Sequence, residues 1–378
     1  MWNLEDLKNK FQKLTEISES LLYDLERAED EIITAAKSEI VSHSKIYKLI
    51  GNNPADIISS LVKTHMEILK QSIRIKTPFI FLKVLPKFYS ICSNRGFHND
   101  YFKIEIVGIM SAFQNILPAY AKNLRTFYEW IFENSKFFMD KSQIKCCQYS
   151  NLEEKFIEQK NILLNHLLSG DEKNANSFIA EITEKEAPED IYLYILYPII
   201  DNLNFLREIG VICKFEFYFG LSIINKLIVF IYKKNKNVKI EKANVAVSSI
   251  NDSDNLDFDE LKNLKIYPGD IVSKLEARII NDSLNYSGIF SEYVDYKGLI
   301  EYLVKNKPPF LVITGVNPFN INIFGKLIER IKDIPELVNT KIYTLTYDHD
   351  GYEDFIKKLN IKTYTQDLIK LYGGIKSV

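Results

Sequence analysis

Few side chains of this chain could bind a metal or act as nucleophiles. Its 378 residues include five histidines and four cysteines. They are His43, His65, His98, His166 and His349, and Cys92, Cys146, Cys147 and Cys213. No two histidines have a metal-ligand spacing, and the sequence has no CxxC, Walker A, GxGxxG or GxSxG motif. The sequence therefore predicts no familiar catalytic centre and no metal site. The cysteine pattern is typical of a cytoplasmic protein with reduced thiols.

Three of these residues could hold a tetrapyrrole. His65 lies in ISSLVKTHMEILKQS, a stretch predicted to be helical. There it could be the axial ligand of a haem or lie over a bilin, or it could have no ligand role. Cys92 could add to the vinyl group of a bilin, or be a small buried hydrophobe. His98 lies near a turn and close to Cys92 in the sequence.

Aromatic side chains are dense between residues 79 and 137, and Arg74, Arg95 and Arg125 lie among or beside them. A tetrapyrrole needs apolar walls for its rings, and arginine side chains bind its propionate carboxylates well. This segment, with Arg95, is therefore a candidate tetrapyrrole site. The alternative is an ordinary helical core with arginines on its surface.

The composition predicts a soluble, cytoplasmic protein. Hydrophobic residues make up 46% of the chain and charged residues 26%, which is enough apolar material for real cores. The net charge of −2 lacks the basic excess expected of a protein that binds nucleic acid. The most apolar segment, residues 221–232, is too short to span a bilayer and contains Lys226. We therefore expect contact with neither nucleic acid nor membrane.

The elements that carry these residues change type along the chain. Residues 1–150 and 151–234 show helical patterns, and residues 4–36 have the heptad pattern of one long helix. That helix would form a homodimer contact or pack on its own chain. After residue 242, five strands alternate with helices, at 243–250, 287–294, 308–316, 340–347 and 361–365. This alternation predicts a parallel, doubly wound sheet that binds ligands at the carboxyl ends of its strands.

The predicted fold class is therefore α + α/β, in four parts. These are a long N-terminal helix (1–50), an all-helical domain (51–150), a four-helix cap (151–236) and a five-stranded, Rossmann-like α/β domain (237–378).

Three stretches of the cap have the pattern of a known family: LLSGD (167–171), EDIYLYILYPIID (189–201), and Gly210 with Ile212. They resemble the cobalamin-binding module of methionine synthases, corrinoid methyltransferase proteins and B12-dependent light sensors. The resemblance implies a helical-bundle cap followed by a flavodoxin-like domain, with Thr314 and Gly315 of FLVITGVNPFN near the cofactor. The helices at 60–140 resemble a globin-like domain that precedes such modules in some light- or tetrapyrrole-sensing proteins.

The resemblance fails at the positions that would hold the cofactor. Ser273 replaces the histidine that ligates cobalt in the family, and a hydroxyl is a poor cobalt ligand. The segment that would pass the nucleotide tail, TYDHDGYED (346–354), is bulky and acidic. In the cap, Arg207, Phe217 and Tyr218 replace the polar anchors above the corrin, and we expect the two aromatic side chains to fill that space. Cobalamin bound through a protein histidine is therefore not expected.

These patterns favour a non-enzymatic sensory or regulatory protein built on a degenerate cobalamin-binding module. It would bind a tetrapyrrole, biliverdin or haem, and signal to a partner protein through a change in assembly. The residues proposed to bind it are His65, Cys92, Arg95, His98, Phe217, Tyr218, Thr314 and Gly315. One alternative is a corrinoid-binding protein for methyl transfer that uses base-off cobalamin. A second alternative is an interaction scaffold without a ligand.

Overall fold

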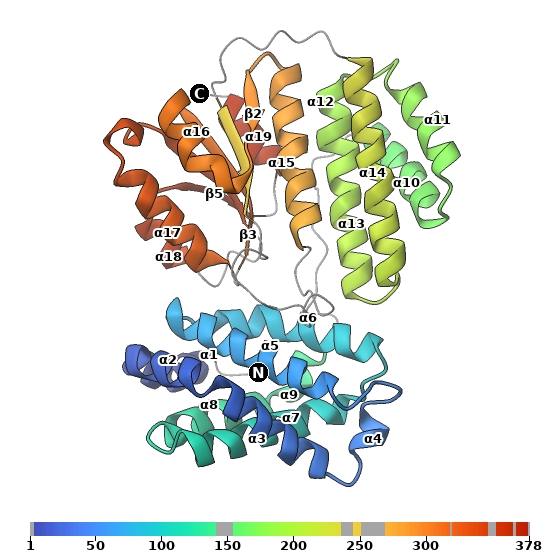
Figure 1. The fold of residues 1–378 in the computed structure, drawn as a ribbon. Coiled ribbons are helices and arrows are strands. Elements are labelled where there is room, and N and C mark those ends of the chain that lie inside the picture. Colours follow the sequence, from blue (N-terminus) through green and yellow to red (C-terminus); the bar gives the residue numbers. More distant parts are fainter. Residues whose placement is uncertain are drawn as a thin grey trace.

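The computed structural model describes residues 4–140, 154–235, 245–250, 269–317, 320–346, 353–365 and 368–376. Figure 1 shows a helical bundle formed by the first of these segments, and above it a helical cap and a sheet that lie side by side. The structure confirms the coarse prediction of a mainly helical chain with one all-parallel, five-stranded sheet. Predictions about residues 141–153, 251–268 and 347–352, among them Cys146, Cys147 and His349, lie outside the described residues.

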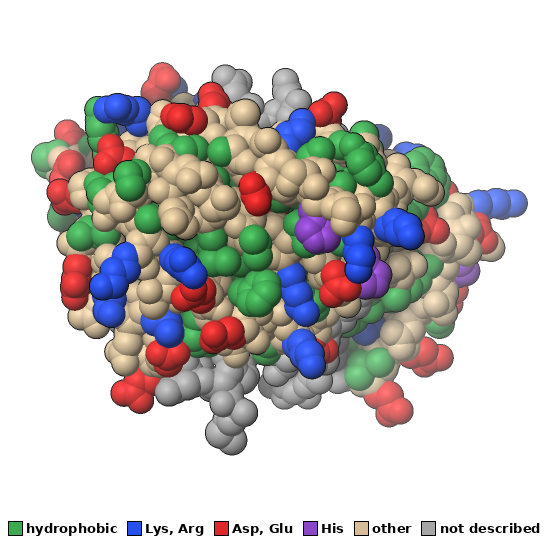
Figure 2. Space-filling model, turned by 90° about the horizontal axis from the view of Figure 1, so that it is seen from below, with side chains coloured by type: hydrophobic (Ala, Val, Ile, Leu, Met, Phe, Trp, Pro, Cys, Tyr) green, Lys and Arg blue, Asp and Glu red, His purple; other side chains and the backbone are tan. Residues whose placement is uncertain are grey.

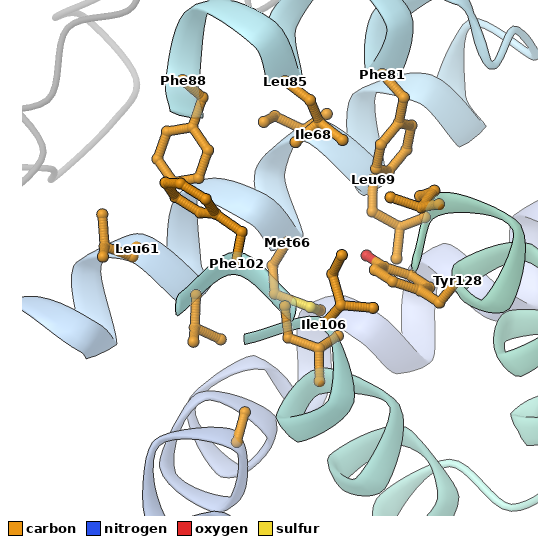
Figure 3. Packing of buried hydrophobic residues seen from close by; sticks show 14 of the residues in the cluster. Leu61, Met66, Ile68, Leu69, Phe81, Leu85, Phe88, Phe102, Ile106 and Tyr128 are labelled. Carbon is orange, nitrogen blue, oxygen red and sulfur yellow. The ribbon is translucent and has the colours of Figure 1, made fainter. Parts of the chain in front are cut away.

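The N-terminal bundle is built from helices alone within residues 4–140. They are α1 (Leu4–Thr15), α2 (Ser18–Arg27), α3 (Glu29–Ser42), α4 (Ile46–Leu49), α5 (Ile57–Arg74), α6 (Phe79–Asn94), α7 (Asn99–Ile116), α8 (Ala121–Glu133) and α9 (Ser135–Phe138). Their buried apolar side chains form one core, part of which is shown in Figure 3. The buried residues of this core end at Phe138, so the bundle is a packing unit of its own.

The prediction of a single helix over residues 4–36 is wrong. The chain turns after Thr15 and again at Ala28, which gives three helices that pack on α8, α5 and α7 respectively. Residues of the heptad pattern, such as Leu7, Leu21 and Ile32, are buried in the bundle core. Neither Gly nor Pro marks the breaks, which let each short helix bury its own apolar side on a different neighbour. These heptad positions therefore pack within the chain, which is the alternative to a dimer contact for this segment.

The cap consists of α10 (Glu154–Leu168), α11 (Glu172–Ile182), α12 (Pro188–Asp190), a π-helical turn (Ile191–Leu196), α13 (Tyr197–Glu208) and α14 (Lys214–Lys234). The π-helical turn ends two residues before Pro198, which has no N–H to donate inside a helix. Within the described segments, α14 is the one helix long and apolar enough to cross a membrane. Here its apolar side, including Ile224 and Ile231, is buried in the cap core.

The strands are β1 (Val245–Ser249), β2 (Ser291–Tyr293), β3 (Phe310–Val316), β4 (Lys341–Thr346) and β5 (Lys362–Thr365). The helices between and after them are α15 (Gly269–Tyr286), α16 (Leu299–Asn306), α17 (Ile321–Lys332), α18 (Glu353–Lys358) and α19 (Leu368–Lys376). All neighbouring strands are parallel, in the order β2-β1-β3-β4-β5. The predicted alternation of five strands with helices is thus confirmed. The strand order reverses between β1 and β3, where doubly wound sheets bind their ligands.

The two faces of the sheet pack on different helices, because side chains alternate along a strand. Val245 and Val247 of β1 lie in a core shared with the cap, α15 and α19, whereas Ala246 lies in a core with α16, α17 and α18. Figure 1 shows these two groups of helices on opposite sides of the sheet. The cap and the sheet therefore share one core, which distinguishes them from the bundle.

The bundle meets the rest of the chain through α5 and α6 (Figure 1). Gln71 of α5 accepts a hydrogen bond of 2.7 Å from Asn322 at the start of α17, which follows the carboxyl end of β3. Ser90 of α6 donates its hydroxyl to the carbonyl of Glu208 at the end of α13, at 2.8 Å. Lys87 Nζ lies 3.8 Å from the Glu208 carboxylate. The bundle thus contacts both the carboxyl edge of the sheet and one end of the cap.

The bundle face that points away from the cap and the sheet carries charges of both signs. Figure 2 shows acidic and basic side chains interspersed over this face, with single hydrophobic side chains between them. A stripe of Lys and Arg, the footprint of many nucleic-acid-binding proteins, is not visible in this view.

Candidate ligand pocket between the bundle and the cap

The predicted site residues do not come together in one place. His65 and Cys92 lie in the bundle interior, and His98 lies at an exposed helix start. Arg95 and Tyr218 line a pocket between bundle and cap, with Phe217 behind it. Thr314 and Gly315 lie at the sheet edge.

A buried polar cluster, consisting of His65, Tyr89, Tyr101, Glu105 and Tyr128, lies in the bundle core. Its members come from α5, α6, α7 and α8. Within the described structure, none of their polar side-chain atoms has a hydrogen-bond partner. His65 Nδ1 lies 4.0 Å from Glu105 Oε1, which is too far for a hydrogen bond. Figure 3 shows the ring of Tyr128 in this core, with its hydroxyl turned toward the interior.

Burial favours the neutral form of both titratable groups in this cluster. It lowers the pKa of His65 to about 3 and raises the pKa of Glu105 to about 8. Cys92 is also fully buried, and burial, with the nearby Glu105 carboxyl, raises the pKa of its thiol well above the usual range. In this structure the thiol lies inside the bundle core, as expected of the alternative interpretation of Cys92 as a small buried hydrophobe.

His65 is a core residue and not an accessible ligand. Its ring packs against those of Phe81 and Tyr128, with centroid distances of 6.0 and 5.4 Å. A haem bound to His65 would have to displace this packing. Across the described residues, no group of three or more His, Cys, Asp and Glu side chains is placed to hold a metal ion.

His98 has a local role at the start of α7. Its exposed ring accepts a hydrogen bond from the backbone N–H of Asp100 through Nδ1, at 3.2 Å. This contact caps the helix. The structure therefore does not bring His98 together with His65 or Cys92 around a ligand.

Ser273 closes the part of the carboxyl edge of the sheet where a cofactor would approach Thr314 and Gly315. Thr314 Oγ1 donates a hydrogen bond of 2.8 Å to the carbonyl of Ser273. Gly315 has a φ of +79°, and a Cβ at this position would overlap the Ser273 side chain. Glycine here lets α15 pack directly on β3. Because Ser273 is buried in this contact, the residues present do not fit cobalamin ligated from this position.

A pocket of about 460 Å³ lies between α6 and the turn from α13 to α14. We call it the bundle–cap pocket. Its lining consists of Ile91, Asn94 and Arg95 from the bundle, and Arg207, Gly210, Val211, Ile212, Cys213, Lys214, Glu216 and Tyr218 from the cap. Pockets of about 300–1,000 Å³ are typical of small-molecule sites.

A glycine turn shapes the cap side of this pocket. Gly210 follows α13 with a φ of +79°, and the Val211 N–H bonds back to the Leu206 carbonyl at 2.9 Å. Together with the bond from the Gly210 N–H to the Arg207 carbonyl, this closes the helix as a Schellman motif. A Cβ on Gly210 would overlap the Asn94 side chain, so glycine also permits the close approach of the bundle.

Cys213 and Glu216 begin α14 with reciprocal hydrogen bonds. The Glu216 carboxylate accepts the backbone N–H of Cys213 at 2.7 Å, and the Cys213 sulfur accepts the backbone N–H of Glu216. The hydrogen bond from the Cys213 N–H lowers the pKa of Glu216 below its usual range. Since this carboxylate is engaged at the helix start, the charge offered to a ligand comes mainly from cations.

Three cationic side chains line the bundle–cap pocket: Arg95 from the bundle, and Arg207 and Lys214 from the cap. The Arg207 guanidinium lies 4.6 Å from the centroid of the Phe217 ring and donates to Asn204 Oδ1 at 3.0 Å. Its Nε is buried and has no hydrogen-bond partner among the residues that the structure describes. Burial lowers the pKa of Arg207, but a guanidinium stays charged at neutral pH. Such a pocket suits a carboxylate or a phosphate.

Phe217 and Tyr218 do not share one role, although we expected both to fill the same space. Phe217 is buried in the cap core beneath Arg207, whereas Tyr218 is half-buried and lines the pocket. Sequence reasoning did not select Arg207, Cys213 or Lys214 as ligand-binding residues. The Gly210 turn followed by a helix start was a visible signal for the cap side of the pocket, but Arg95 comes from a distant part of the chain.

Comparison with known proteins assigns the chain to no family. No protein-family model matches the chain, and no curated protein matches it.

Proposed function

We propose that this protein is a non-enzymatic sensor that binds an anionic tetrapyrrole in the bundle–cap pocket. One observation carries the proposal: both bodies contribute cations to the same pocket, Arg95 from the bundle and Arg207 with Lys214 from the cap. A ligand with two carboxylates would therefore bridge the two bodies.

The pocket offers complementary chemistry to a propionate-bearing ring system. Arginine forks bind carboxylates in a planar, two-point geometry, and Arg207 has a buried N–H without a partner in the described structure. Tyr218 and Ile91 supply apolar surface to the walls. The expected tetrapyrrole site is thus moved from the aromatic bundle core, where His65 and Cys92 lie, to the edge of the bundle at Arg95.

A bilin suits this pocket better than haem. Haem iron needs an axial ligand, usually a histidine, and no histidine is among the residues that line the pocket. A metal-free bilin needs only walls and carboxylate partners. The alternative function, a corrinoid carrier for methyl transfer, would need space for a corrin at the sheet edge. Ser273 is buried there against Gly315, so the structure does not support this alternative.

Signalling would follow from the contacts that dock the bundle on the cap. Ser90 and Lys87 of α6 bind Glu208, one turn or less before the Gly210 turn that lines the pocket. A ligand that prefers one arrangement of α6 and α14 shifts the equilibrium toward that arrangement. The output would be a changed surface for a partner protein or a second copy of the chain. In this proposal the cap and the sheet, whose strand order is that of flavodoxin, form a degenerate cobalamin-binding module.

Absorption spectra test this proposal directly. Purified protein is titrated separately with biliverdin, haem and cobalamin, and we expect saturable binding with a shifted band for biliverdin. Arg207→Gln and Arg95→Gln should each weaken binding by about tenfold, the loss of roughly one charge-assisted hydrogen bond. Arg125→Gln is the matched control, because Arg125 is exposed on α8 and pairs with Glu129.

The outcomes separate the alternatives. A corrin band with cobalamin alone would select the corrinoid carrier, and a haem band that is lost in a His65 variant would restore His65 as a ligand. Unchanged spectra with all three compounds would contradict the sensor proposal.

One observation favours the ligand-free scaffold as a second candidate. Phe215 and Phe219 stack with 5.9 Å between ring centroids, and Phe215 is 73% exposed. Val211, which precedes α14 in the chain, is 64% exposed. Exposed apolar patches often mark protein interfaces. If this patch joins two copies of the chain, Phe215→Ser should shift the sedimentation of the protein toward the monomer, without any ligand. A concentration-independent monomer in the unmodified protein would rule this interface out.

A further inference from the structure

The buried polar cluster of the bundle needs hydrogen-bond partners that its own side chains do not supply. His65, Tyr89, Tyr101, Glu105 and Tyr128 are each at most 1% exposed, and none of their polar side-chain atoms has a partner among the described residues. Buried polar groups of folded proteins are almost always hydrogen-bonded, because an unpaired group loses its hydration without compensation. A molecule from solution is therefore the expected partner of this cluster.

The charge of the cluster decides what kind of molecule this is. Burial raises the pKa of Glu105 to about 8 and lowers the pKa of His65 to about 3, so both groups are mostly neutral at neutral pH. Burial also raises the pKa of all three tyrosines, so their hydroxyls stay neutral. An ion would therefore enter the core without a counter-charge from the cluster, which is costly. The expected ligand is neutral.

The cluster offers both donors and acceptors to such a ligand. A neutral imidazole has one of each, a protonated carboxyl donates through its O–H and accepts through its C=O, and a tyrosine hydroxyl does both. The ligand must also be small, because rings pack closely around these groups. The centroid of the His65 ring lies 5.4 Å from that of Tyr128, and the centroid of the Tyr89 ring lies 4.0 Å from that of Phe102.

We propose that the buried polar cluster is an internal water-binding site, in which a bound water bridges His65 and Glu105. His65 Nδ1 and Glu105 Oε1 lie 4.0 Å apart, which is too far for a direct hydrogen bond. A water with hydrogen bonds of about 2.8 Å to each atom spans this separation. Internal waters commonly make about three hydrogen bonds. The nearby Glu105 carboxyl contributes to the raised pKa of all three tyrosines, so their hydroxyls are the candidates for the further bonds.

Such a site would join four helices through one set of hydrogen bonds. His65 lies on α5, Tyr89 on α6, Tyr101 and Glu105 on α7, and Tyr128 on α8. Hydrogen bonds that share a bound water reinforce one another, so a change at one of these groups would be felt by the others. The site lies in the bundle core, and it does not depend on which ligand the bundle–cap pocket binds.

A crystal structure of the full chain, at a resolution that shows ordered water, tests the proposal directly. We expect a water within about 3.2 Å of both His65 Nδ1 and Glu105. A core in which these two side chains bond to each other directly, or in which their polar atoms contact no water, would overturn the proposal. Density for a molecule larger than water would overturn it as well.

Magnetic relaxation dispersion of water nuclei tests the site in solution, because it counts waters that stay bound for longer than the protein takes to tumble. The double variant His65→Leu/Glu105→Leu removes both bridged groups and should lower the number of long-lived waters. Thr64→Val is the matched control and should leave this number unchanged, because Thr64 is buried beside His65 on α5 but its hydroxyl already donates to the Ser60 carbonyl at 2.9 Å. Equal numbers in the unmodified protein and the double variant would contradict the water site.

Discussion

His65 Nδ1 and Glu105 Oε1 lie 4.0 Å apart in the bundle core, and both side chains are fully buried. Neither has a hydrogen-bond partner in the described part of the chain. The other titratable side chains around Glu105 are Tyr89 and Cys92 from α6, Tyr101 from α7 and Tyr128 from α8. Burial raises the pKa of each of them, so they add no charge near neutral pH. The protonation of His65 and Glu105 therefore couples the stability of the bundle to pH.

The pair should give the bundle a stability plateau with a fall on each side. Glu105, with its pKa raised from 4.5 to about 8, makes stability fall as pH rises through that window, because the folded state binds the extra proton. His65, with its pKa lowered from 6.5 to about 3, makes stability rise with pH through its window. The two slopes cancel between pH 4.5 and pH 6.5. Below and above this pH range, the free energy of unfolding should fall by about 2 kcal/mol on each side, at roughly 1.4 kcal/mol per pH unit. Urea unfolding followed by tryptophan fluorescence measures this, because Trp130 lies in the bundle core.

Single substitutions should remove the acid fall and the alkaline fall in stability separately. Glu105→Gln should abolish the alkaline fall and make the bundle several kcal/mol more stable than the unmodified protein at pH 8, because a buried amide has no proton to lose. His65→Gln should abolish the acid fall. Tyr128→Phe is the matched control, since it removes a buried hydroxyl that stays neutral across this range, and it should leave the shape of the profile unchanged. An alkaline fall that persists in Glu105→Gln would contradict the assignment.

Gly210→Ala should loosen the bundle from the cap. Gly210 and Gly288 both have positive φ, +79° and +82°, but an added Cβ overlaps Asn94 at Gly210 and meets nothing within 4 Å at Gly288. Both substitutions share the cost of the left-handed backbone, about 1–2 kcal/mol. Gly210→Ala should cost about 1 kcal/mol more, because Asn94 must give up its hydrogen bond to the Glu208 carbonyl. Chemical denaturation of both variants, repeated in an Asn94→Ala background, checks this. The extra cost should vanish in that background, and its persistence would count against the contact.

Lys70→Met should be far more costly than Lys226→Met. Lys70 is buried between Glu67, at 2.8 Å, and Glu29, at 3.0 Å. Burial alone would raise the pKa of Glu67, but Lys70, Gln71 and Arg74 outweigh it and lower that pKa. Removal of Lys70 leaves a buried carboxylate with weaker compensation, at a cost of about 3 kcal/mol.

The exposed pair of Lys226 with Glu172 on the cap should be worth less than about 1 kcal/mol. Glu67→Gln added to Lys70→Met should recover much of the loss, and the unfolding free energies of the three variants test it. Equal costs for the two lysine substitutions would show that burial of Lys70 is unimportant.

The sheet was predictable from the sequence because its signal is local. Short β-branched runs separated by helical patterns fix the alternation. The strand ends lie within two residues of the predicted bounds, except that β2 begins four residues later than predicted. The helix breaks near Thr15 and Ala28 were not predictable, because nothing in the local sequence opposes a helix there. They arise from packing on α8, α5 and α7, which is information held elsewhere in the chain.

The candidate sites were predictable only in part. His65 was selected for its chemistry, but Glu105 was not selected, although Tyr101 and Ile109 at four-residue spacing place it on the buried side of α7. The bundle–cap pocket joins segments far apart in the sequence, so no spacing rule could unite Arg95 with Arg207. Gly210 had a local signal, but its contact with Asn94 is a tertiary fact.

Ser273→His tests whether the sheet edge could hold cobalamin, the cofactor that the proposed resemblance to a cobalamin-binding module implies. The substitution introduces a residue type that can ligate cobalt, but Ser273 is buried, its carbonyl accepts from Thr314, and its side chain lies against Gly315. An imidazole there would overpack the contact between α15 and β3, at a cost of about 1–3 kcal/mol. We therefore expect a less stable protein that shows no corrin spectrum with added cobalamin, measured beside Ser273→Ala as the control for loss of the hydroxyl. A histidine-ligated corrin spectrum in Ser273→His, with unchanged stability, would show that this edge can open and would revive the corrinoid alternative.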